Sequence, residues 1–174
     1  RVWQTEPLQG AALDTAQALV DVIRFWLELG ADGFRVDMAD SLVKFDDAGA
    51  VGKEQTRRVW QWVFDQVRPD FPDAVFVSEW GRPDQSLDAG FDMDFYLDWR
   101  WDGIPNGYNM LLRNTSTPLE HDDDASYFNA DSATGIAPFL AEYEPRLGAA
   151  QQAGGLFDFI TCNHDTVRVR PRLS

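Results

Sequence analysis

Three carboxylates in this sequence each follow a short apolar segment that is typical of a β-strand: Asp37, Glu79 and Asp165. When parallel strands close into a barrel, their carboxyl ends lie on one rim, so these distant side chains can converge. Two carboxyl groups across a small gap can act as acid and nucleophile in the cleavage of a glycosidic bond, and a close pair gives retention of configuration. The sequence therefore predicts a site for this chemistry at the carboxyl ends of its strands.

The segment before Asp37 places an arginine beside the carboxylate. Side chains alternate between the two faces of a strand, so Gly33, Arg35 and Asp37 share one face while Phe34 and Val36 share the other. The apolar pair is expected to pack outward against helices, and the guanidinium is expected to keep Asp37 ionised.

Glu79 follows an apolar run and precedes Trp80, a setting that favours the protonated form of a carboxyl group. One neutral and one charged carboxyl group are what an acid and a nucleophile require. Simpler interpretations exist for each residue. Asp37 can be a turn or capping residue, Arg35 an ordinary ion-pair partner, Glu79 a solvated loop acid, and His164 with Asp165 a turn.

The elements that must position these residues alternate along the chain. We expect helices at about 14–29, 53–68 and 136–152, a short helix at about 108–113, and strands at 33–37, 74–81, 91–96 and 156–161. Asp14 suits the N-cap of the first helix and Gly30 suits the position after its end. Near-continuous apolar strands joined through helices predict a parallel sheet covered on both sides.

Two of the expected helices carry apolar residues at three- and four-residue spacing, which predicts a buried face on each. These residues are Leu19, Val20, Ile23, Trp26 and Leu27 in the first helix, and Val59, Trp60, Val63, Phe64 and Val67 in the second.

Composition limits the classes of partner. The chain has 174 residues and a net charge of −14, and such an acidic protein repels nucleic acid and anionic membrane surfaces. No apolar run approaches the length of a membrane span, which is about 20 residues. Cys162 is the single cysteine, so no internal disulfide can form. The sequence leaves the location open, with the cytoplasm slightly favoured.

Three motifs carry a resemblance to a known family. The segment from Asp32 to Asp37 (DGFRVD), that from Val77 to Gly81 (VSEWG), and Asn163-His164-Asp165 resemble the second, third and fourth sequence regions of the α-amylase family, glycoside hydrolase family 13. They stand in the family's order and at plausible separations. The resemblance implies an α/β fold in which residues 1–174 form part of a TIM-type (β/α)8 barrel, approximately strands four to seven.

The resemblance also implies roles for individual residues. Asp37 resembles the nucleophile that forms the glycosyl-enzyme intermediate, Glu79 the general acid/base, and Asp165 the third carboxylate, which grips sugar hydroxyls. The substrate-binding residues expected beside them are Arg35, His164, Trp80 and Asn163.

The chain also departs from the family pattern. Asp40-Ser41 stands where many α-amylases have a Lys-His pair, so no metal site is expected in this chain, although a full-length relative can hold calcium. The family's first region is not present.

The function expected from these motifs is that of a retaining α-glycoside hydrolase acting on α-linked oligosaccharides or polysaccharides. The alternatives are a transglycosidase of the same family and a non-catalytic carbohydrate-binding or scaffold relative. Half a barrel leaves two strand edges unpaired, so the isolated chain is expected to be inactive and to form homo-oligomers through those edges.

Overall fold

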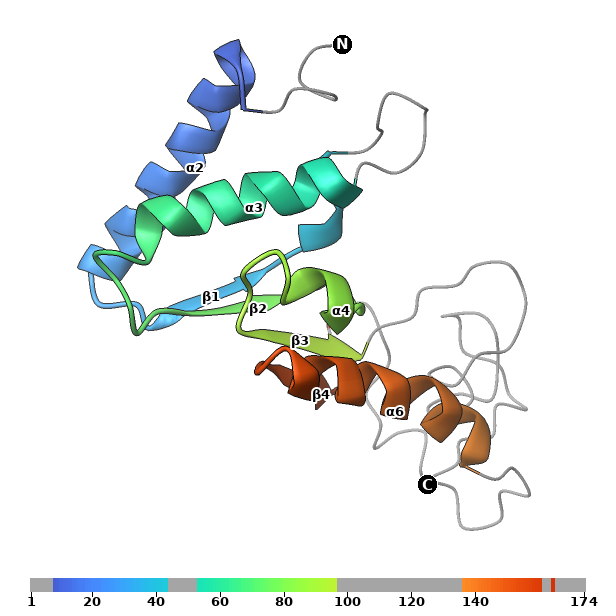
Figure 1. Ribbon diagram of the computed structural model, residues 1–174. Coiled ribbons are helices and arrows are strands. Elements are labelled where there is room, and N and C mark those ends of the chain that lie inside the picture. Colours follow the sequence, from blue (N-terminus) through green and yellow to red (C-terminus); the bar gives the residue numbers. More distant parts are fainter. Residues whose placement is uncertain (1–7, 44–52, 97–135, 161–163, 165–174) are drawn as a thin grey trace.

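The computed structural model describes residues 8–43, 53–96, 136–160 and 164 (Figure 1). Its centre is a sheet of four parallel strands in the order β1-β2-β3-β4, which is also their order along the chain. The strands are β1 (Gly33–Val36), β2 (Val75–Ser78), β3 (Met93–Tyr96) and β4 (Leu156–Phe159). All four lie within the expected segments, and each is shorter than its segment.

The first helix, α2 (Gly10–Glu28), begins four residues before the expected start at Asp14. Gln9 is the N-cap, and Asp14 lies inside the helix, because the alanines that follow Gly10 favour the helical state. The expected end at Gly30 is confirmed. Gly30 has a φ of 100°, its N–H donates to the Leu27 carbonyl, and the next N–H donates to Trp26, which together form a Schellman motif.

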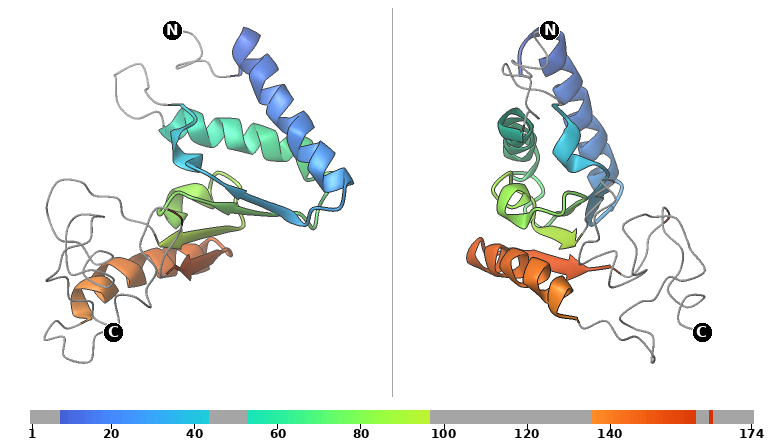
Figure 2. Two further views of the ribbon diagram at one scale, coloured as in Figure 1. Left: turned by 180° about the vertical axis from the view of Figure 1, so that it is seen from behind. Right: turned by 90° about the vertical axis from the view of Figure 1, so that its right-hand side faces the viewer.

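The second helix, α3 (Lys53–Val67), matches its expected span, and its whole apolar face is buried. Val63 of α3 and Phe76 of β2 are both completely buried. The ring of Phe64 packs edge-on against that of Phe76, with 4.9 Å between the ring centres. Each such side chain contributes about 1.5–3 kcal/mol of hydrophobic stabilisation when fully buried. This packing holds α3 against the sheet (Figure 2).

Trp26 on α2 was expected to be buried, and this prediction is wrong, because 51% of the residue is exposed. It belongs instead to a second apolar stripe on the outer face of α2. The stripe consists of Val22, Phe25, Trp26 and Leu29, all exposed. The inner face, with Val20, Ile23 and Leu27, packs into the core as expected.

The C-terminal half of the sheet has its own core. The expected third helix is α6 (Ala137–Gln152), which passes through Pro145, and it packs on β4 with Phe139 and Ala150 buried. A four-residue helix, α4 (Pro83–Ser86), lies after β2 and was not expected. A short 3-10 turn, η1 (Ala39–Ser41), follows β1. The expected helix at 108–113 lies outside the described residues.

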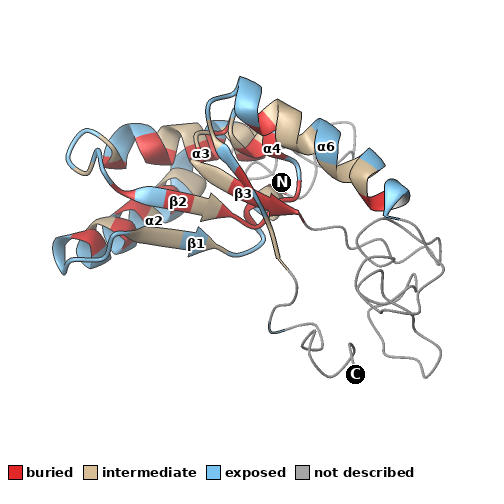
Figure 3. Ribbon diagram, turned by 90° about the horizontal axis from the view of Figure 1, so that it is seen from below, coloured by how far each residue is buried: buried red, intermediate tan, exposed pale blue. Residues whose placement is uncertain are grey.

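The two faces of the sheet have different surroundings. Phe34 and Val36 pack against the core formed with α2 and α3, as the alternation of side chains predicts. On the other face Val75 and Leu156 are 48% and 66% exposed, so within the described residues the helices cover one side of the strands and not both (Figure 3). Uncovered inner positions are what four strands of a barrel present before the remaining strands close over them.

The architecture is therefore α/β, with helices joining sequential parallel strands. This is the arrangement of part of a TIM-type barrel.

Candidate functional site

Asp37 and Glu79 occupy neighbouring positions because of the register between β1 and β2. Val36 pairs with Ser78, so each carboxylate is the first residue past its strand. The backbone N–H of Glu79 donates to the Val36 carbonyl at 2.9 Å, which extends the ladder by one step. The structure thus brings together, at the carboxyl ends of two adjacent strands, two of the three carboxylates that the sequence singles out.

Arg35 joins the two carboxylates. Its Nη1 lies 2.6 Å from Oδ1 of Asp37, and its Nη2 lies 2.8 Å from Oε1 of Glu79. The guanidinium also stands over the ring of Phe95 on β3, 5.9 Å from the ring centre. The planar fork of an arginine can bind two acceptors at once, which a lysine ammonium does less well.

The two carboxyl groups differ in exposure. The side chain of Asp37 is 66% exposed, whereas that of Glu79 is 8% exposed. Hydrogen bonding from Arg35, followed by a hydrogen bond with Glu79, lowers the pKa of Asp37 below its usual range. Burial raises the pKa of Glu79, and the bond with Asp37 raises it further, although the Met38 N–H and the charge of Arg35 oppose this. The two shifts therefore favour Glu79, and not Asp37, as the member of the pair that holds a proton.

Met38 has a backbone conformation that residues other than glycine rarely adopt. Its φ and ψ are both 43°, in the left-handed region. In this conformation its N–H donates to Oε2 of Glu79 at 2.8 Å. Strained backbone of this kind is concentrated at functional sites.

Trp80 is buried in the first core cluster, with 8% of its surface exposed. Its indole N–H donates to Oε1 of Gln85 at 3.1 Å, and its ring lies edge-on to Phe91 at 6.3 Å. In this position most of the ring contacts protein, and its expected contact with a sugar stays a prediction.

His164 is exposed in a turn after β4, and its charge is the smallest of the contributions that lower the pKa of Asp37. Asn163 and Asp165 lie outside the described residues. The third carboxylate of the predicted site therefore stays a prediction.

Sequence reasoning missed two contributors to this rim, Met38 and Asp94. Met38 acts through its backbone N–H, for which no sequence signal exists. Asp94 could have been noticed in the sequence. An acidic residue at a helix-facing position of an apolar strand is unusual, because burial of a carboxylate is costly. The carboxylate of Asp94 accepts hydrogen bonds from the backbone just past Glu79.

Other parts of the structure add little to the chemistry of this rim. Within the described ranges there is no cluster of three or more His, Cys, Asp or Glu side chains that could hold a metal ion. In the same ranges no helix has the length and apolar character needed to cross a membrane. A cavity of about 540 Å³ lies between α2 and the start of α3, and those of its lining residues that the structure describes, which include Leu19, Leu42 and Val59, carry no titratable group.

Comparisons with known proteins agree with the motifs. No family model matches the chain. The chain is similar to the trehalose synthase/amylase TreS of Mycobacterium tuberculosis (strain CDC 1551 / Oshkosh), with 36% identity over 63 residues, and to that of Mycolicibacterium smegmatis, with 30% identity over 63 residues. The matched stretch is 36% of this chain and 10–11% of the relatives' own length.

Among solved structures, Eubacterium rectale Amy13B aligns with 52% of this chain and 17% of its own, with a TM-score of 0.40 and 22% identity. The ordered motifs resemble those of the α-amylase family, glycoside hydrolase family 13, and the similarity to the two TreS proteins over 63 residues supports this resemblance.

Proposed function

We propose that this chain carries the nucleophile and the acid/base of a retaining α-glycoside hydrolase that acts on α-glucans or α-glucosides. We further propose that residues 1–174 form part of one catalytic barrel in a longer parent protein, because four strands make up about half of such a barrel. The observation that carries the functional proposal is the Arg35 bridge, which holds Asp37 and Glu79 together while their pKa values move in opposite directions.

In the first step an ionised oxygen of Asp37 attacks the anomeric carbon of the sugar. The bond between that carbon and the glycosidic oxygen breaks, and the departing oxygen takes the proton of Glu79. The products are a glycosyl ester on Asp37, a free alcohol and an ionised Glu79. Arg35 and the Met38 N–H then stabilise the new charge on Glu79.

In the second step ionised Glu79 removes a proton from water, and the water oxygen attacks the anomeric carbon. The ester bond breaks, Asp37 leaves as a carboxylate, and Glu79 is again protonated. Two inversions give net retention. The closeness of the carboxyl groups supports this route, because inverting enzymes keep about 6.5–9.5 Å between them to admit a water molecule, whereas this pair shares one guanidinium.

A sugar hydroxyl can replace water in the second step, which makes the enzyme a transglycosidase. The names of the relatives favour this second candidate, since TreS is described as both a synthase and an amylase. The same two residues serve both reactions. A non-catalytic relative is the weaker alternative, because a binding protein has no need of one ionised and one protonated carboxyl group under a shared arginine.

The test is to trap the intermediate in the parent protein with 5-fluoro-α-glucosyl fluoride. We expect mass spectrometry of peptides to find the sugar on Asp37, and we expect Asp37→Asn to abolish both the adduct and the hydrolysis of maltooligosaccharides. An adduct on another residue, or near-normal hydrolysis by Asp37→Asn, would rule out the assignment.

A further inference from the structure

Asp94 is a completely buried carboxylate in the middle of β3. Its Oδ1 accepts three backbone hydrogen bonds, from the N–H groups of Trp80 at 3.2 Å, Gly81 at 3.1 Å and Phe95 at 2.9 Å. Its Oδ2 is buried and has no hydrogen-bond partner among the described residues.

A carboxylate in this position is costly. A buried charge is destabilising unless it is paired, and buried acids are usually matched with Arg or Lys. Asp94 has no such ion pair within the described part of the chain, and its charge is compensated chiefly by backbone dipoles. Burial raises the pKa of Asp94, while hydrogen bonding from the Gly81 and Phe95 N–H groups, the Ser78 side chain and the Trp80 N–H acts against that rise. Core packing does not account for this residue, because an apolar side chain would fill the position at lower cost.

Two of the hydrogen-bond donors show that the Asp94 carboxylate holds the backbone just after Glu79. Trp80 and Gly81 directly follow Glu79, and Gly81 has a φ of 73°, so the chain turns sharply there. Before the turn, Ser78 pairs in register with Asp94 itself. On its other side, the N–H of Glu79 donates to Val36. The backbone of Glu79 is thus fixed by β1 on one side and by Asp94 on the other.

We propose that Asp94 is a positioning residue, which anchors the turn after β2 so that the carboxyl group of Glu79 faces Asp37 and Arg35. This inference rests on the proposed function, since it assumes that Glu79 delivers a proton. Asp94 touches neither Asp37 nor the arginine in the described structure, and it acts through the backbone of Trp80 and Gly81. Hydrogen bonds to an ionised acceptor are about twice as strong as neutral ones, which favours a carboxylate over an amide for holding three donors.

The experiment compares two substrates in the parent protein. A maltooligosaccharide needs a proton from Glu79 when its alcohol departs, whereas α-glucosyl fluoride releases fluoride with little need of one. A displaced acid therefore slows the first reaction far more than the second. For Asp94→Asn we expect kcat/KM on maltopentaose, which reports the first step alone, to fall about 10-fold or more, because acid–base catalysis contributes about 100- to 10,000-fold in total. On α-glucosyl fluoride we expect kcat/KM to stay within about 3-fold. The comparison uses kcat/KM because the second step, which enters kcat, needs Glu79 as a base for both substrates.

Asp94→Ala removes the acceptor altogether, and we expect a larger loss on maltopentaose with the same selectivity. Circular dichroism establishes that each variant is folded. A loss that is equal on the two substrates, or no loss on maltopentaose, would overturn the proposal. Failure of both variants to fold would overturn it too, because Asp94 would then serve the fold and not the site.

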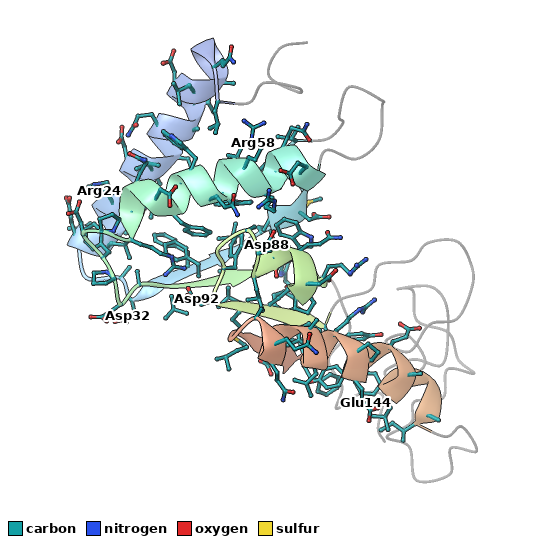
Figure 4. All side chains as sticks on the ribbon, viewed as in Figure 1. Arg24, Asp32, Arg58, Asp88, Asp92 and Glu144 are labelled. Atoms are coloured by element: carbon teal, nitrogen blue, oxygen red, sulfur yellow. The ribbon has the colours of Figure 1, made fainter. Side chains whose placement is uncertain are left out.

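Asp92→Asn is the matched control. Asp92 stands just before β3, at the amino end of the strand (Figure 4), and its Oδ2 accepts from Arg68 at 2.9 Å and from the Phe76 N–H at 2.8 Å. This change should lower thermal stability and leave the ratio of the two activities unchanged.

The proposed function is tested separately by the wild-type protein. If wild type forms no adduct and cleaves neither substrate, the hydrolase proposal fails. If wild type is active and Asp94→Asn shows no selectivity between the substrates, only the role of Asp94 fails.

Discussion

The N–H of Met38 donates a 2.8 Å hydrogen bond to Oε2 of Glu79, although the two residues stand 41 positions apart in the sequence. The bond exists because Met38 adopts a left-handed conformation directly after Asp37. Met38, which follows the proposed nucleophile Asp37, thereby fixes the position of the carboxyl group of Glu79, the proposed acid.

This relationship predicts opposite effects of two substitutions at Met38. A left-handed conformation costs a residue with a Cβ atom about 1–2 kcal/mol, and glycine avoids this cost. Met38→Gly should therefore keep the hydrogen bond and raise the free energy of unfolding in urea titrations. Met38→Val should lower both stability and turnover, because a β-branched side chain tolerates this conformation least. Equal stability of the two variants would contradict the interpretation.

Arg35 lowers the pKa of both carboxyl groups, of Asp37 chiefly by hydrogen bonding and of Glu79 by its charge. Arg35→Met should therefore move both limbs of the profile of kcat/KM against pH toward higher pH, and should reduce kcat/KM about 100-fold or more through the loss of orientation. Arg24→Met is the control, since Arg24 pairs with Asp70 on the surface and should leave the profile unchanged.

Glu79 also makes stability depend on pH. Its pKa is raised in the folded state, so its contribution to stability is fully present below the unfolded pKa and is lost as pH rises through the folded pKa. Glu79→Gln lacks this loss. The melting temperature of Glu79→Gln, relative to that of wild type, should therefore increase as pH rises from the unfolded pKa of Glu79 through its folded pKa. A difference that is constant with pH would contradict the raised pKa. Asp37 has the opposite sign, because its lowered pKa stabilises the fold at higher pH and the benefit fades in acid.

Gly33 opens β1 and lies close against the backbone of Val75 in β2. A Cβ atom at Gly33 would overlap the backbone of Val75, which cannot retreat without breaking the ladder. We expect Gly33→Ala to destabilise the protein by about 1–3 kcal/mol, as overpacking does. Gly148 lies in α6, and a Cβ atom added there would meet nothing within 4 Å, so Gly148→Ala should stabilise by about 0.5–1 kcal/mol. Urea denaturation of both variants measures the contrast.

The strand edges lead to a prediction for the chain by itself. β1 and β4 are the outer strands of the described sheet, and on the face that the described helices leave uncovered Val75 and Leu156 are exposed. We expect the isolated chain to be inactive and to form oligomers in light scattering, because open edges pair with other chains. A monomer with measurable hydrolysis of maltooligosaccharides would contradict both expectations.

Sequence patterns predicted the fold well where one physical signal dominates. The bounds of α3 follow from its single apolar stripe and from the proline after it. The burial pattern of α2 was harder to predict, because this helix has apolar residues on two faces, and spacing alone did not assign Trp26 to the outer one. Its start was misplaced because Asp14 is a good capping residue that here lies inside the helix.

The site was predictable in part for a similar reason. Asp37 and Glu79 stand at strand ends, and strand ends are visible in the sequence. The N–H groups of Met38, Trp80 and Gly81 belong to the backbone and carry no residue-specific signal, so their contacts with Glu79 and Asp94 needed coordinates.

The close approach of Gly33 to Val75 has a consequence for how this protein could fail. Side chains alternate along a strand, so a shift of β2 by one residue against β1 would turn Glu79 toward the helices and bring Ser78 to the rim. Such a protein could still bury much of its core, but Glu79 would be absent from the site and could not act as the proposed acid. Gly33, which has no side chain, allows the two backbones to meet in the one register that keeps Glu79 at the carboxyl ends of the strands.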